Sequence, residues 1–437
     1  MIGRFWQPWK GRAMIQVFFG SWALFIGMFM LMIGNGLQGT LLGLRGDIEG
    51  FSTFSLSIVM SAYFMGFLFS SRYTPKLISR VGHVRVFAAM GSTISAVLIL
   101  YPLLVDPISW TVGRIVIGFC FCGVYVTAES WLNDASSNET RGQSLSVYMI
   151  VQMAGVVFAQ FIVSLGDVSG YVLFIIPSVL VSLAFAPILL SVKPTPAFEA
   201  AKPMTVREVI AASPLACFGM FMLGGVFAAQ FGMSAIYGNR IGLTVGEISL
   251  FVSAIYVGAL VAQYPIGWLS DRADRRVLIV WVSLIGSAGS LIAFLVSDLY
   301  AIIVLSGVIV GGTSNPLYAL LLAYTNDYLD REDMAAASGG LLFINGLGAI
   351  LGPLIVGVMM DVIGANGFWL YTAFLMLGIG SFGMYRATQR SRSDLDAEAV
   401  PYATVTASTT PVFAEVAQEV YIEAEEEVIA EEQAGTA

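Results

Sequence analysis

Two ionisable side chains, Arg114 and Glu129, lie within one long apolar stretch of the sequence, residues 108–132. A charged group in such surroundings is costly, so each of them is a candidate for function. Arg114 has two functional interpretations: it contacts an anion, or it is a switchable partner for an acid that carries a proton. The structural alternative is an arginine that reaches toward a polar boundary or bonds the carbonyl groups of a neighbouring helix.

Glu129 follows Arg114 by fifteen residues, which is about 22 Å along a helix at 1.5 Å per residue. The two side chains therefore cannot pair with each other on this helix. Arg80 and Arg141 belong to basic segments that could reach Glu129. An ion pair between Glu129 and one of these arginines would hold the ends of neighbouring helices together and act as a closed gate. The alternatives are that Glu129 carries a coupling proton, or that these charges are solvated and only set the topology.

Enzymatic chemistry has little support in this sequence, which contains one histidine and three cysteines. Cys120, Cys122 and Cys217 all lie in apolar stretches, where a thiol acts as a small hydrophobe. Neither a nucleophile–base pair, a metal site nor a disulfide framework is indicated. We expect no enzyme, no metal and no cofactor.

Composition identifies the surroundings of these residues as lipid. The chain is 57% hydrophobic and only 11% charged, whereas a soluble globular domain has about 25% charged residues. So few charges cannot solvate the surface of a folded chain of this length. We expect the lipid bilayer as its surroundings and no nucleic acid as a partner.

Twelve stretches along the chain are long and apolar enough to span a membrane, since a spanning helix needs about 20 mostly apolar residues. They are separated by charged or Gly/Pro/Asp-rich segments. The stretches cover residues 15–43, 52–73, 84–105, 108–132, 142–166, 170–192, 214–238, 246–268, 277–297, 299–324, 334–360 and 365–386.

Basic residues are concentrated on one side of these spans. Eighteen of the 21 Lys and Arg fall on the side of the N-terminus, and only Arg45 and Arg240 fall on the other. The positive-inside rule then predicts that both termini are cytoplasmic. We expect a multi-pass protein of the cell inner (plasma) membrane.

The first half of the chain is repeated in the second half, at an offset of 192 or 193 residues. Composition does not place polar residues and glycines together at one offset, so the pattern indicates two parallel six-helix repeats. In that arrangement a solute site lies between the repeats, near the bilayer midplane. The matched pairs include Gln38 with Gln230, Gly66 with Gly258, Arg80 with Arg272, Gly118 with Gly311 and Asp134 with Asp327.

Amide side chains in the apolar stretches are candidates for the solute site. A buried amide needs hydrogen-bond partners, so it either bonds a neighbouring helix or faces a solute. The equivalent positions of Gln38 and Gln230 favour the cavity, and Asn35 is a further candidate. Weaker candidates are Gln152, Gln160, Gln263 and Asn345.

The repeat divides the chain into four parts. Residues 1–192 are predicted to form an N-terminal six-helix bundle, 193–213 a cytoplasmic linker, and 214–387 a C-terminal six-helix bundle. Residues 388–437 form a tail that holds eleven of the 29 acids. Because this tail has no lasting hydrophobic period, we expect it to be solvated and largely disordered.

The segment Gly267–Arg276 reads G-W-L-S-D-R-A-D-R-R. It resembles the loop signature of the major facilitator superfamily, G-x-L-a-D-R-x-G-R-[KR], with Asp274 where the second glycine is usual. The stretch from Arg114 to Gly118 is similar to the R-x-x-x-G element of the same family. Within the family, residues 128–134 and 323–327 look most like the bacterial YcaD-type group.

The resemblance implies an all-α membrane transporter of twelve helices, in which the helices at 15–43 and 214–238 flank a central cavity. It also implies a charge contact at the loop of Asp271 and Arg272. Charges at matching helix ends and loops could form pairs that favour one state of the transporter. The candidates for this cytoplasmic gate are Glu129, Arg80, Arg141, Asp134, Asp271, Arg272 and Asp327.

These observations predict a secondary transporter that moves a small organic solute by alternating access, coupled to protons and acting as a monomer. The first helix has no acid before Asp47, which favours a neutral, zwitterionic or anionic solute over a cation. The alternative is a non-transporting membrane sensor or scaffold that uses the acidic tail as its contact surface. No effector domain accompanies the helices, and this favours transport.

Overall fold

The computed structural model of this chain describes residues 22–135, 138–191, 204–329, 331–389 and 410, except for some side chains near helix ends. Almost all of these residues are helical. The first half contains α2 (Trp22–Ile48), α3 (Thr53–Val81), α4 (His83–Leu100), α5 (Pro107–Ala135), α6 (Asn138–Leu165) and α7 (Val172–Ser191). The second half contains α8 (Val206–Ala212), α9 (Pro214–Ala228), η1 (Ala229–Met233), α10 (Ser234–Arg240), α11 (Val245–Ser270), α12 (Arg275–Leu295), α13 (Tyr300–Asn326), α14 (Arg331–Ile363) and α15 (Gly367–Gln389).

Eleven spans in the described part of the chain are long and apolar enough to cross a membrane. One of them is α9, η1 and α10 in succession, with the π-helical turn η1 in its middle. Helix α7 is apolar over the shorter range Val172–Pro187 and is the twelfth span. The predicted all-α fold of twelve transmembrane helices is therefore confirmed.

Helix α3 is longer than the sequence predicted. It continues to Val81 rather than ending near residue 73, because Thr74 and Ile78 are buried against the bundle. The helix stops at Gly82, whose φ of 84° is easily adopted only by glycine. A buried face thus extends a helix through a segment whose charges suggested a loop.

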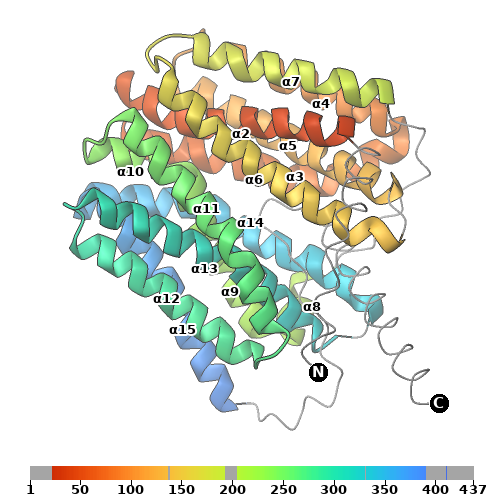
Figure 1. The fold of residues 1–437 in the computed structure, drawn as a ribbon, viewed down its shortest axis with the longest axis vertical. Helices are drawn as coiled ribbons and strands as arrows, with labels where there is room; N and C mark the ends of the chain where they lie inside the picture. The colour runs from red at the N-terminus through yellow and green to blue at the C-terminus, as the bar shows by residue number, and fades with distance from the viewer. Residues whose placement is uncertain (1–21, 136–137, 192–203, 330, 390–409, 411–437) are drawn as a thin grey trace, which may run out of the picture.

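The helices form two bundles, with α2 to α7 in one and α9 to α15 in the other (Figure 1). In the first bundle α2 packs on α6 and α3 on α5, and in the second α9 packs on α14 and α11 on α13. These pairs are equivalent under the sequence repeat, so the structure confirms two six-helix repeats.

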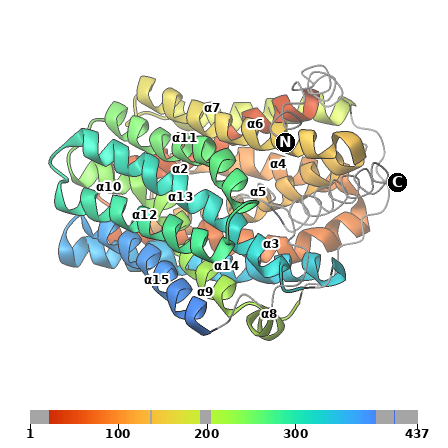
Figure 2. The same ribbon diagram turned by 60° about the horizontal axis from the view of Figure 1, so that its bottom comes forward.

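The two bundles meet through α3 against α14 and through α6 against α11. Figures 1 and 2 both place α10 at one end of the bundles and α8 at the opposite end. We call these the α10 end and the α8 end. The short α8 begins at Thr205, whose side chain and Glu208 form a capping box.

Four glycines allow close helix crossings within the bundles, and Gly224 and Gly348 allow an equally close one between α9 and α14. Gly66 and Gly118 let α3 and α5 meet backbone to backbone, and Gly258 and Gly311 do the same for α11 and α13. A Cβ at any of the four would collide with the backbone of the facing helix. Such small residues at crossings are typical of helix packing in membranes.

Candidate functional site

A cavity lies between the two bundles, with an empty volume of about 1300 Å³ including the space at its mouth. Its lining comes from α2, α3, α5 and α6 in the first bundle. In the second bundle it comes from α9 with η1, α11, α13 and α14. These are the first, second, fourth and fifth spans of each repeat. Equivalent helices of the two repeats therefore enclose one site.

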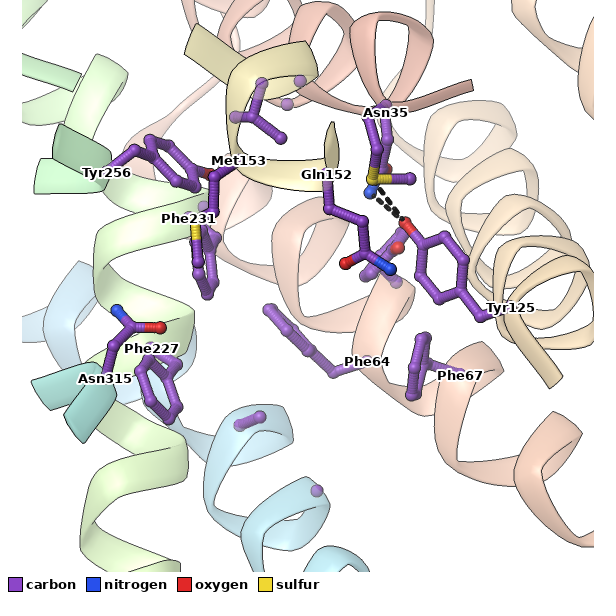
Figure 3. Close-up of a pocket in the computed structure, with 18 of the residues that line it drawn as sticks. Asn35, Phe64, Phe67, Tyr125, Gln152, Met153, Phe227, Phe231, Tyr256 and Asn315 are labelled. Atoms are coloured by element: carbon purple, nitrogen blue, oxygen red, sulfur yellow. Dashed lines mark hydrogen bonds between the residues drawn. The ribbon is translucent and has the colours of Figure 1, made fainter. Parts of the chain in front are cut away.

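Aromatic rings line both walls of this cavity. In Figure 3, Phe64 and Phe67 project from α3 on one side, and Phe227 and Phe231 face them from the second bundle. The rings of Phe227 and Phe231 are stacked, with centroids 5.9 Å apart and planes inclined by 19°. The full set of lining aromatic residues is Tyr63, Phe64, Phe67, Tyr125, Phe227, Phe231 and Tyr256.

A chain of hydrogen bonds fixes Asn35 and Tyr125 in the cavity wall. Asn35 donates from Nδ2 to the hydroxyl oxygen of Tyr125 at 2.8 Å, as the dashed line in Figure 3 marks. Gln38 donates from Nε2 to Oδ1 of Asn35 at 2.9 Å. Asn35 and Tyr125 line the cavity, whereas Gln38 is buried behind them.

Gln230 is also buried away from the cavity. It exchanges hydrogen bonds with the hydroxyl of Ser314 on α13, and its Nε2 lies 3.1 Å from that oxygen. The expectation from the sequence was that Gln38 and Gln230 face the cavity. The structure differs because each amide finds a partner inside its own bundle.

Arg114 lies in the cavity wall on α5 with only 4% of its surface exposed. Its guanidinium carbon is 4.7 Å from the centre of the Tyr63 ring, and its Nη2 is 3.7 Å from Sδ of Met60. Its Nε has no hydrogen-bond partner among the described residues. The alternative in which Arg114 bonds backbone carbonyls of a neighbouring helix is therefore not what the structure shows.

Several lining residues were weak candidates in the sequence or were missed. Gln160 accepts a hydrogen bond from Thr40 at 2.9 Å, and Asn345 donates to the carbonyl of Met220 at 2.9 Å. Asn315 was missed, although an amide within the apolar stretch 299–324 is the signal that identified the others. The aromatic lining gave no such signal, because rings are common throughout this chain.

Glu129 is buried near the α8 end, with 2% of its surface exposed. It accepts a hydrogen bond from the Tyr148 hydroxyl at 3.2 Å and another from the hydroxyl of Thr410. Arg80 is exposed and forms no ion pair with Glu129 in this conformation. Arg141 and Asp134 lie in α6 and α5, but their side chains are outside the described part of the structure.

Charges at the α8 end of the second bundle make local contacts. Asp327 pairs with Arg275, and both side chains are largely buried. Arg272 lies over the ring of Trp268 at 4.4 Å and donates to its carbonyl oxygen, while Asp271 is exposed. Arg275 belongs to the loop signature but was not among the predicted gate residues. Its ion pair joins the start of α12 to the end of α13 within one bundle.

The predicted tail lies almost entirely outside the described residues. Its first two residues, 388 and 389, belong to α15. Thr410 is also described: it is 1% exposed and its hydroxyl donates to Glu129. At this one position the tail meets the α8 end of α5.

Contacts at the α10 end join the two bundles. Asn239 donates to Asp47 at 2.7 Å, and the two residues are separated by 192 positions, the offset of the repeat. Arg240 donates to the hydroxyl of Thr53 in the first bundle at 3.1 Å and pairs with Asp361 of its own bundle at 2.8 Å. None of these residues was predicted to belong to a gate.

Two repeats of six membrane helices around a shared central cavity define the architecture of a secondary membrane transporter. The chain belongs to the Major Facilitator Superfamily, whose family model matches residues 24–242 and 215–416. The resemblance inferred from the sequence is thereby confirmed. Membership also confirms that this is a multi-pass membrane transporter and not an enzyme.

Curated relatives support the subgroup as well. The chain is 25% identical over 366 residues to the uncharacterized MFS-type transporter YcaD of Escherichia fergusonii, covering 82% of this chain and 92% of that protein. It is 24% identical over 367 residues to the protein of the same name from Salmonella arizonae, with the same two coverages.

Solved structures share the fold. The nucleoside transporter NupG superposes with a TM-score of 0.70 at 16% identity, covering 84% of this chain and 98% of that one. A bacterial homolog of the human lysosomal transporter Spinster, in an inward-facing and unoccupied conformation, has a TM-score of 0.66 at 14% identity, with coverages of 95% and 98%.

Proposed function

We propose that this protein moves a small organic solute across the inner membrane by alternating access, with the central cavity as its binding site. The observation that carries the proposal is the placement of the cavity between equivalent helices of two repeats, with contacts between the bundles at the α10 end. In transporters of this plan, one repeat rocks against the other around a fixed site.

The basic residues orient the molecule. Because they gather on the side of the N-terminus, the positive-inside rule makes the α8 end cytoplasmic, and with it both termini. The contacts of Asp47 with Asn239 and of Thr53 with Arg240 then close the outer side. On this assignment we infer an inward-facing state, supported by the contacts that join the bundles at the α10 end.

Glu129 is the candidate for coupling transport to protons or for closing the inner gate. Among the side chains that the structure describes, its carboxylate is the least exposed. A cytoplasmic latch between Glu129 and Arg80 is expected only when the inner side is closed. Their separation in an inward-facing state is consistent with that role. The sensor or scaffold alternative has no observation in its favour beyond the contact of Thr410 with Glu129.

Labelling from both sides tests the proposal. Met153 lines the cavity from the middle of α6, so Met153→Cys should react with a membrane-impermeant thiol reagent in right-side-out and in inside-out vesicles. The background lacks Cys120, Cys122 and Cys217, which are all buried. Reaction from one side alone would show a static cavity and contradict alternating access.

The same vesicles test the orientation. Asp106→Cys should react from outside, and Arg80→Cys, which is exposed at the α8 end, should react only after permeabilisation. The opposite pattern would reverse the assignment of the two ends.

The variant Glu129→Gln is expected to raise the reactivity of Met153→Cys from the cytoplasmic side by up to about fivefold. A lost ion pair worth about 1 kcal/mol shifts a two-state population by that factor. The protein should remain folded, as judged by its melting temperature in detergent.

A different result would assign the other role. If Glu129 carries the proton, Glu129→Gln leaves the reactivity unchanged but removes its dependence on pH. If neither the reactivity nor its dependence on pH changes, Glu129 has neither role and contributes only to the membrane topology.

A further inference from the structure

We propose that the solute is a planar organic monoanion, an aromatic carboxylate, whose negative charge is held by Arg114. This inference rests on the proposed transport function and specifies the chemical class that the cavity takes. Its support comes from three features of the cavity wall: the charge of Arg114, the aromatic rings, and the Oδ1 atom of Asn315, which has no hydrogen-bond partner among the described residues.

The cavity wall carries one positive charge and no negative charge among the described residues. Arg114 is the charged residue of the lining, and the remaining lining residues are apolar, aromatic, hydroxyl or amide side chains. The contacts of its guanidinium are the ring of Tyr63 and the sulfur of Met60, and neither neutralises a charge. A buried ion without a counter-charge is unfavourable, so a ligand with one negative charge is the natural partner.

The rings define the body of the ligand. Four of the lining aromatic residues belong to the first bundle and three to the second. Figure 3 shows Phe64 between Phe67 of the first bundle and Phe227 of the second. Phe231 also contacts Tyr256, with ring centres 5.4 Å apart. Aromatic rings pack favourably against one another in stacked or edge-to-face geometry. A flat aromatic solute can pack against rings of both walls at once.

Asn315 adds a hydrogen-bond acceptor to the wall. It is 3% exposed, lines the cavity from α13, and its Oδ1 has no hydrogen-bond partner among the described residues. A buried acceptor without a partner is costly, so a ligand that bears an N–H or O–H group would satisfy it. Arg114 and Asn315 belong to different bundles, and a ligand that uses both would link the two repeats.

The competing role for Arg114 is that of a partner for a proton-carrying acid of the protein. That role needs a carboxylate beside the guanidinium. The described lining residues include none, and Glu129 is fifteen residues further along the same helix. The observations therefore favour an anion supplied by the solute.

Binding to purified full-length protein in detergent tests this inference by isothermal titration calorimetry at pH 7.5. The probes are benzoate, 3-phenylpropanoate and indole-3-acetate, each compared with its neutral amide, together with acetate as an anion without a ring. We expect at least one aromatic carboxylate to bind saturably. Its amide should bind at least about tenfold more weakly, because a buried cation left without its counter-ion loses at least this much. Acetate should also bind at least about tenfold more weakly than the aromatic carboxylate, because it has no ring to pack against the aromatic walls.

Substitutions of Arg114 test whether its guanidinium binds the carboxylate of the solute. Arg114→Gln should weaken the binding of the carboxylate by about 30-fold or more and leave the weak binding of the amide unchanged, while Arg114→Lys should restore part of the affinity. Arg85→Gln is the matched control, because Arg85 is exposed on α4 and does not line the cavity. Loss of a guanidinium that has no hydrogen-bonded oxygen should not unfold the protein, and the melting temperature of each variant verifies this.

Three results would overturn the inference: none of the three carboxylates binds, an amide binds as tightly as its acid, or Arg114→Gln retains full affinity for the acid. These failures are separable from a failure of the transport proposal. Labelling of Met153→Cys from both sides of the membrane does not depend on the charge of the solute.

Discussion

A cross-link between the two bundles at the α10 end is expected to abolish labelling of the cavity from outside. Asp47 and Asn239 are hydrogen bonded at 2.7 Å, so cysteines at both positions can be joined by a short bis-thiosulfonate reagent. With the bundles held together there, the outward-facing state is removed from the equilibrium. A cysteine at Met153 should then react from the cytoplasmic side only, and the rate from outside should fall to that of a buried thiol.

Reduction of the cross-link should restore the reaction from outside. The single variants, Asp47→Cys alone and Asn239→Cys alone, provide controls because neither can be linked across the bundles. Unchanged labelling from outside in the cross-linked protein would mean that solutes reach the cavity by a path that does not pass between Asp47 and Asn239.

The glycine crossings give the second large effect. Gly66→Ala and Gly311→Ala each place a methyl group against the backbone of the facing helix, at Ile115 and Ile255 respectively. Overpacking of a tight contact costs about 1–3 kcal/mol, and a backbone neighbour cannot rotate away as a side chain can. We expect a clearly lower melting temperature in detergent and a smaller monodisperse fraction for both variants.

Gly246→Ala is the matched control for these two substitutions. Gly246 lies in the first turn of α11, and a Cβ there would have no atom within 4 Å. Its melting temperature should equal or exceed that of the parent protein, because alanine favours helix over glycine. If Gly66→Ala and Gly311→Ala were as stable as Gly246→Ala, the close backbone crossings would not contribute to the stability of each bundle.

Much of the fold could be predicted from the sequence because its signals are local or repetitive. Twenty apolar residues bounded by charges identify a span, and the offset that relates Gly66 to Gly258 identifies the repeat. The structure then shows why those glycines recur: each one marks the same helix crossing in its own bundle. The end of α3 at Val81 was missed because burial, and not composition, continues the helix through Thr74 and Ile78.

The cavity could be predicted only in part, because sequence does not show which way a helix faces. In lipid, the outer surface and the core are both apolar, so Gln38 and Asn35 on one helix cannot be assigned to different sides from their types. The structure separates them by a hydrogen bond in which Gln38 supports Asn35 from behind. Arg114 was identified because a charge in an apolar stretch stands out, whereas Phe64 and Phe231 did not stand out among 29 phenylalanines.

Pairs between distant segments were also beyond the sequence. Asp327 and Arg272 were both candidates for the gate with no partner assigned to either, and the structure pairs Asp327 with Arg275. The contact of Asp47 with Asn239 joins two positions that the repeat itself relates. A search for polar residues at the repeat offset near the outer ends of the spans could have found it.

The most direct test of alternating access measures both ends of the cavity in one preparation. Double electron–electron resonance would use one pair of spin labels at Ser52 and Gly246, at the α10 end, and a second pair at Arg80 and Arg272, at the α8 end. In reconstituted protein we expect two distance populations for each pair of labels. Addition of a solute that binds, or the Asp47–Asn239 cross-link, should lengthen the mean distance of one pair and shorten that of the other. A single fixed distance at both ends, or changes of the same sign, would contradict the account of two repeats that rock around a central site.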